Sequence, residues 1–127
     1  MDAKLYLAIS SVIAFLYGLA FELFPGPVTA LFGVTPEAHL TLNLRFFGAA
    51  LIGLATTQWL ARDFKHWDAV RGVLIGAVAG YALIGLVNLW GTFRGLINGL
   101  AWSSTLLVVL LLIGAFYCLA NPPTRAT

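Results

Sequence analysis

The feature that most constrains this chain is an apolar run at residues 71–93 in which three glycines recur at every fourth position. The run reads RGVLIGAVAGYALIGLVNLWGTF and has no charged residue after its first. At ~1.5 Å per residue, a helix of this length spans about 34 Å, enough to cross the hydrocarbon core of a membrane. The spacing places Gly72, Gly76 and Gly80 on one helical face, where another backbone can approach closely. We expect this segment to be the central helix of a membrane bundle.

The composition of the whole chain also indicates a membrane protein. Of its 127 residues, 61% are hydrophobic and 9% are charged. So few charged residues cannot provide the polar surface that a soluble globular protein of this size needs. This length fits one domain, residues 1–127. The net charge of +2 comes from scattered loop residues, so we expect no nucleic-acid partner. The single cysteine, Cys118, has no partner for a disulfide or a CxxC redox motif.

Four apolar runs are long enough to span a membrane, and they lie at about 5–24, 40–61, 69–93 and 96–120. Pro25 and Pro27 end the first run, and residues 28–32 then form a short apolar turn in the headgroup layer. Arg94-Gly95 is a turn so short that the last run must return antiparallel beside the third. The sequence therefore predicts an all-α fold, an integral membrane antiparallel four-helix bundle with a short interfacial helix between spans 1 and 2.

The positions of lysine and arginine outside the spans predict the orientation. With four spans, one side of the membrane carries Lys4, Arg62, Lys65, Arg71 and Arg125, and the other carries Arg45 and Arg94. Because cytoplasmic loops are enriched in these residues, we expect both termini to be cytoplasmic.

Four polar residues fall near one membrane depth on the extracytoplasmic side: Glu22, Arg45, Arg94 and Asn98. Charges at membrane depth are functional candidates by default. Two guanidinium groups facing one carboxylate leave an excess of positive charge, which suits an anionic head group, a carboxylate or a quinone oxygen. We therefore predict a ligand-binding site here. The structural alternative is an ion pair between Glu22 and Arg45, with Arg94 extending to the head groups.

Small residues are expected to pack the helices, since lipid provides little hydrophobic drive for association between spans. On the first and second spans the small faces include Gly18 and Gly48. On the third and fourth spans the predicted packing residues are Gly72, Gly76, Gly80, Gly95 and Gly99. The alternative use of such a face is self-association of two copies. Asn88 is expected to form an interhelical hydrogen bond.

Several chemistries are disfavoured by position along the chain. His39 and His66 fall on opposite sides of the membrane, so they cannot share a metal or a haem. No serine, histidine and aspartate share one depth, so hydroxyl catalysis has no activating base. We predict no catalytic residue, no metal site and no evident cofactor, with lipid or quinone as the open options.

The end of the first span, FELFPGPVTALFG, and the arginine that opens the second, LRFFGAALIGLA, make the chain resemble small bacterial four-span proteins of the DoxX-like group, especially its uncharacterised members. The resemblance covers the layout of the whole chain, and Arg45 and Gly48 match its pattern. It implies a bacterial inner membrane and a role in quinone-coupled sulfur oxidation or as an accessory membrane subunit.

Three functional hypotheses follow. The first is a non-enzymatic membrane protein, an accessory subunit or lipid/quinone-binding module with its polar site at the extracytoplasmic face. The second is a small transporter or channel acting as an oligomer, which needs a hydrated path from Glu22 past Ser11, Thr56 and Ser103. The third is a quinone-linked oxidoreductase subunit. The expected partners are membrane lipids and either a larger membrane complex or further copies of the chain.

Overall fold

The computed structural model describes residues 2–123, and every element in that range is a helix. The helices are α1 (Ala3–Leu23), α2 (Pro25–Leu31), α3 (Ala38–Ala61), α4 (Trp67–Phe93) and α5 (Ala101–Ala120). All except α2 are long and apolar enough to cross a membrane. The chain is therefore an integral membrane protein, and the all-α bundle of four spans with a short helix after the first is confirmed.

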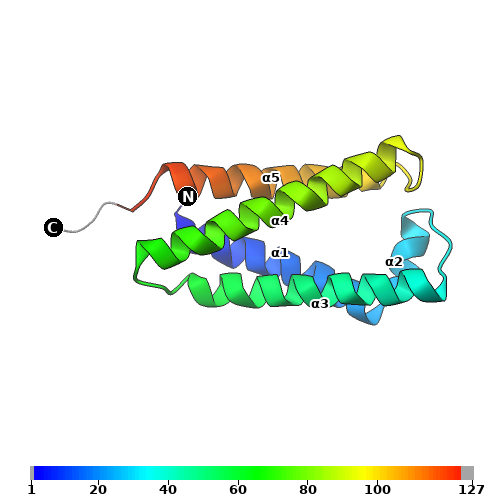
Figure 1. Ribbon diagram of the computed structural model, residues 1–127, viewed down its shortest axis with the longest axis horizontal. Coiled ribbons are helices and arrows are strands. Elements are labelled where there is room, and N and C mark those ends of the chain that lie inside the picture. The colour runs from blue at the N-terminus through cyan, green and yellow to red at the C-terminus, as the bar shows by residue number, and fades with distance from the viewer. Residues whose placement is uncertain (1, 124–127) are drawn as a thin grey trace.

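The four long helices form two antiparallel pairs, α1 with α3 and α4 with α5. Figure 1 shows that the pairs converge where both termini lie and diverge toward α2. We call these two ends of the bundle the terminal end and the α2 end. The expectation that α4 is central is wrong, because α1 contacts α2, α3 and α5, whereas α4 packs mainly on α5 and less on α3.

Local sequence sets the limits of the helices. The Asp2 carboxylate caps α1 by accepting a hydrogen bond from the Leu5 amide at 2.8 Å. Pro25 opens α2, where its missing N–H costs nothing. The last span begins at Ala101 and not at residue 96 as predicted. The reason is Asn98, whose side chain accepts a hydrogen bond from the Leu100 amide at 3.0 Å and holds residues 96–100 in a turn.

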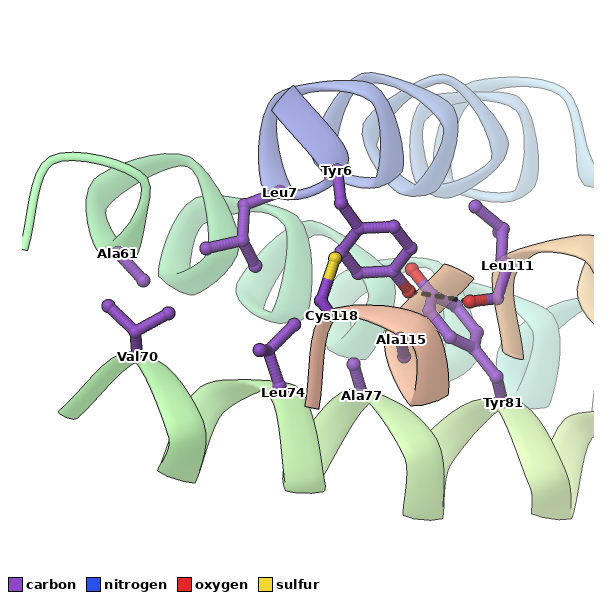
Figure 2. Packing of buried hydrophobic residues seen from close by; sticks show 10 residues of the cluster. All are labelled: Tyr6, Leu7, Ala61, Val70, Leu74, Ala77, Tyr81, Leu111, Ala115 and Cys118. Carbon is purple, nitrogen blue, oxygen red and sulfur yellow. Dashed lines mark hydrogen bonds between the residues drawn. The ribbon is translucent and has the colours of Figure 1, made fainter. Parts of the chain in front are cut away.

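A buried cluster fills the terminal end of the bundle (Figure 2). Its members are Tyr6, Leu7, Ala61, Val70, Leu74, Ala77, Tyr81, Leu111, Ala115 and Cys118. Three of them are fully buried alanines, one each from α3, α4 and α5, and their small size lets the backbones approach. The Tyr6 hydroxyl crosses from α1 to α5 and donates to the Leu111 carbonyl at 2.8 Å. This end is the packed core of the molecule.

The closest helix contact joins α1 to α3 through two glycines. A Cβ added at Gly48 would lie 2.8 Å from the Gly18 carbonyl oxygen, and one added at Gly18 would lie 2.9 Å from the Gly48 carbonyl oxygen. Only glycine leaves room for backbones at this distance. The small faces predicted on the first two spans therefore do meet.

The glycines predicted to pack the third and fourth spans do not pack against residues 2–123. A Cβ built at Gly72, Gly76, Gly80, Gly95 or Gly99 would meet no atom of this described part within 4 Å. On α4 the reason is that Leu74 and Tyr81 turn inward, since burying large side chains gains more dispersion contacts than burying glycine. Gly95 and Gly99 lie in the turn before α5 and not on it. Self-association through the α4 glycine face stays a prediction.

Candidate functional site: a cavity between the helix pairs

The divergence of the two helix pairs leaves a cavity of about 520 Å³ on the α2 side of the buried cluster. All five helices contribute to its wall. This volume lies within the range of small-molecule binding sites in proteins, roughly 300–1,000 Å³. No prediction from the sequence pointed to this cavity.

Aromatic side chains of α1 and α3 build one wall of the cavity. The Phe21 ring packs 5.3 Å from the Phe47 ring across the two helices, and 6.3 Å from the Tyr17 ring on its own helix. These rings are much larger than the alanines buried in the terminal half of the bundle.

The wall is almost entirely apolar. None of the residues that line it is Asp, Glu, Lys, Arg or His. Apart from the hydroxyls of Tyr17 and Tyr81, the polar side chains on the wall are those of Thr29, Asn88 and Ser104. Thr29 is already satisfied, because its hydroxyl donates to the Gly26 carbonyl at 2.8 Å. Such a wall suits a hydrocarbon chain and opposes the burial of a charge.

At the terminal end of the cavity lies Tyr81, which belongs both to the wall and to the buried cluster. Its hydroxyl is 2.6 Å from the Ser10 hydroxyl and accepts a hydrogen bond from Gln58 Nε2 at 3.3 Å. Ser10 and Gln58 are fully buried, and Gln58 Oε1 has no hydrogen-bond partner among residues 2–123. This polar cluster ties α1, α3 and α4 together at the floor of the cavity.

Nearer the α2 end, Asn88 of α4 faces both the cavity and α5. Its Nδ2 donates to the Thr105 hydroxyl across the two helices at 3.4 Å. The expected interhelical hydrogen bond of Asn88 is therefore confirmed. Ser104, the neighbour of Thr105, also lines the cavity.

The cavity opens along α4. Leu83 and Val87 lie on its rim, and these two side chains are 63% and 67% exposed, whereas the other lining residues are buried or half-buried. Because these two side chains are exposed on a span, this rim faces the lipid chains in a membrane. Molecules of the bilayer interior can therefore reach the cavity without passing through water.

Comparison with known proteins gives a family. The family model described as domain of unknown function (DUF8292) matches residues 1–120. The chain belongs to the DUF8292 family. No curated protein and no solved structure matches it. The matched residues include α1 to α5, so every residue that lines the cavity of this DUF8292 protein lies within the family match. The likeness to the DoxX-like group stays a prediction.

The charged residues predicted as a ligand site lie outside the cavity wall of the DUF8292 protein. Glu22 is half-buried beside α3, and its Oε2 has no partner. Arg45 and Arg94 are exposed, and no ion pair within residues 2–123 joins either one to Glu22. The structure therefore gives no support to the alternative of a Glu22–Arg45 ion pair, and ligand binding by these residues stays a prediction.

Asn98, the fourth predicted ligand residue, holds two elements of the DUF8292 protein together. Its side-chain Nδ2 donates to the Leu31 carbonyl at 2.9 Å, and its backbone amide donates to the Phe32 carbonyl at 3.0 Å. These bonds fasten the α4–α5 turn to the end of α2. The α2 end of the cavity is thereby covered by chain.

Sequence reasoning missed the residues that shape the cavity. Phe21, Phe47 and Val87 read as ordinary apolar residues of a span, and nothing in a hydropathy pattern separates a cavity wall from a packed core or a lipid-facing surface. One signal was present in Gln58, since an amide within an apolar span needs a buried partner. That signal leads to Tyr81 and so to the floor of the cavity.

Proposed function

We propose that this DUF8292 protein is a non-enzymatic integral membrane protein that binds a lipid-like molecule in the cavity between its helix pairs. The observation that carries the proposal is the 520 Å³ apolar cavity with its opening along α4. The proposed ligand site is the cavity and not the charged residues predicted from the sequence. The protein serves as a lipid- or quinone-binding module or as an accessory subunit that presents such a molecule to a partner.

The chemistry of the wall supports a cavity filled by hydrocarbon. Water is a poor filler because so few polar groups line the wall, whereas a hydrocarbon chain matches its apolar side chains.

The size of the cavity suits one hydrocarbon chain. Its 520 Å³ lies within the volume range of small-molecule sites, roughly 300–1,000 Å³, and its wall is apolar. An acyl or isoprenoid chain of a membrane lipid therefore matches the space.

The orientation proposed from lysine and arginine has the α2 end outside and the termini in the cytoplasm, in a bacterial inner membrane.

The test is native mass spectrometry of the protein released gently from its own membrane. The wild type is expected to retain a lipid mass, and Leu107→Trp, which adds bulk to the cavity wall, is expected to lose it. Leu106→Trp is the matched control, because Leu106 is 61% exposed and lies outside the wall. A wild type without bound mass, or equal retention by both variants, would refute the proposal.

The transporter alternative gains no specific support. The hydroxyls of Ser11, Thr56 and Ser103 each donate to a carbonyl three or four residues earlier in their own helix. None of the three lies on the wall of the cavity between the helix pairs. The buried cluster fills the terminal end, where a conducting path would have to continue. A quinone-linked oxidoreductase subunit stays a prediction and requires a partner that carries the redox centre.

A further inference from the structure

We infer that the lipid bound in the cavity has an uncharged head group bearing a hydroxyl, and that Asn88 binds this hydroxyl. The inference rests on the proposed function and specifies its ligand class. It concerns the few polar atoms that the cavity offers.

The absence of ionisable side chains from the wall argues against a charged head group. A carboxylate or phosphate in this space would lose its hydration without gaining a cationic partner, which costs far more than one hydrogen bond returns. The arginines at the α2 end, Arg45 and Arg94, are exposed and do not line the cavity. An uncharged lipid has no such cost.

Asn88 offers an unused hydrogen-bonding atom to the cavity. Its Nδ2 makes the long 3.4 Å bond to Thr105, and its Oδ1 accepts no hydrogen bond from any residue in 2–123. If the amide is rotated, the Thr105 hydroxyl donates to Oδ1, and Nδ2 is the unused atom instead. Ser104 lies on the same wall and adds a hydroxyl to the cavity. An asparagine kept in an apolar span with half of its amide unpaired is suited to a ligand.

The amide of Asn88 selects the head-group chemistry. In both orientations it still offers the ligand a donor and an acceptor, because Nδ2 carries two hydrogens and Oδ1 has two lone pairs, of which the bond to Thr105 uses only one. A hydroxyl provides both, whereas a carbonyl or an ether only accepts. The ligand class is therefore a long-chain or isoprenoid alcohol, or another neutral lipid with a free hydroxyl.

Gln58 does not compete for this role. Its unpaired Oε1 is fully buried, but Gln58 is absent from the cavity wall and is reached only behind Tyr81. Asn88 lies five residues before the end of α4, about 8 Å from the α2 end at ~1.5 Å per residue. A hydroxyl held there stays near the membrane surface, and its chain fills the apolar space toward Tyr81.

The experiment uses the full chain in phosphatidylcholine nanodiscs and a hexadecanol that carries a diazirine for photolabelling. Unlabelled hexadecanol, hexadecane, hexadecanoate and phosphatidylglycerol compete with the probe. We expect hexadecanol to compete roughly two- to tenfold better than hexadecane, the effect of one net hydrogen bond. Hexadecanoate and phosphatidylglycerol are expected to compete no better than hexadecane.

Two variants assign the preference to the residue. Asn88→Leu is expected to remove the advantage of hexadecanol over hexadecane, and Ser104→Ala to reduce it. Asn43→Leu is the matched control, because Asn43 is an exposed asparagine of α3 outside the cavity wall, and it should keep the full preference. If Asn88→Leu does not fold, the ratio of hexadecanol to hexadecane in the wild type and in Ser104→Ala decides.

The outcomes separate the two proposals. No saturable labelling of the wild type by any probe would refute the proposed function itself. Saturable labelling with equal competition by hexadecanol and hexadecane would leave chain binding in place and overturn the hydroxyl inference. Stronger competition by hexadecanoate or phosphatidylglycerol, or an unchanged preference in Asn88→Leu, would also overturn it.

Discussion

A methyl group added at Gly48 should separate α1 from α3, whereas the same change at Gly76 should not disturb the fold. The Gly48 position lies against the Gly18 carbonyl oxygen of α1, and the Gly76 position of α4 meets nothing within 4 Å. Both residues lie inside long membrane-spanning helices, so Gly48→Ala and Gly76→Ala form a matched pair. The pair tests which helix face holds the bundle together.

The structure gives the size of the effect. The added Cβ would lie 2.8 Å from the Gly18 oxygen, and an ordinary contact begins at 3.4 Å, so the helices must separate by about 0.6 Å. Overpacking of this kind costs about 1–3 kcal/mol. Alanine returns up to ~1 kcal/mol through its higher helix propensity, so Gly48→Ala should destabilise by up to about 2 kcal/mol once that gain is subtracted. Gly76→Ala has only the favourable term and should stabilise by up to ~1 kcal/mol.

The assay is the free energy of unfolding in mixed micelles titrated with a denaturing detergent, followed by tryptophan fluorescence and helical circular dichroism. Native mass spectrometry of each variant reports whether the number of chains per particle changes. Destabilisation by Gly76→Ala as large as that by Gly48→Ala would refute the reasoning, because it would mean that the α4 glycine face is packed. If that destabilisation came with loss of a dimer, the face would be a self-association surface.

Three further outcomes are expected. Tyr81→Phe should lower the free energy of unfolding by about 1–3 kcal/mol, because it leaves two buried polar partners unsatisfied. Tyr6→Phe removes only one hydrogen bond, to a backbone carbonyl, and should lower the free energy of unfolding by less. A larger loss of stability in Tyr6→Phe than in Tyr81→Phe would contradict the role of the polar cluster at the cavity floor. Asn98→Ala should speed hydrogen exchange in α2 while changing global stability little, and unchanged exchange there would show that the turn does not fasten α2. In intact cells, a membrane-impermeant maleimide should label His39→Cys and spare His66→Cys until the membrane is broken, and labelling of both would contradict the proposed orientation.

The sequence predicted the fold well because span length and hydropathy depend on the bilayer and not on packing detail. Helix boundaries were less predictable where a side chain competes with the helix. Residues 96–100 continue the apolar run, yet Asn98 accepts a hydrogen bond from the Leu100 amide and bonds to the end of α2, so the helix begins at Ala101. The Asn98-Gly99 pair was a local turn signal for this boundary, which hydropathy alone does not show.

The sequence was misleading about which glycines pack. A spacing of four shows that a set of small residues shares a face, but not which way the face points. On α4 the opposite face contains Leu74, Ala77 and Tyr81, and the bundle buries that face instead. On α1 and α3 Gly18 and Gly48 meet at the crossing point, with Ile52 and Phe21 packed beside them.

The candidate site was less predictable than the fold, because it arises from a difference between the two ends of the bundle. At the terminal end, Ala61, Ala77 and Ala115 are fully buried and let the helix pairs converge. At the α2 end, Phe21 and Phe47 pack on each other within the α1–α3 pair and line the cavity between the pairs. An even distribution of side-chain size would give parallel pairs and a solid core, whereas this gradient gives a wedge. Lipid chains enter the space between the diverging helix pairs from the side. The ligand is therefore lipid-like, and the polar groups of the wall decide only which lipid binds.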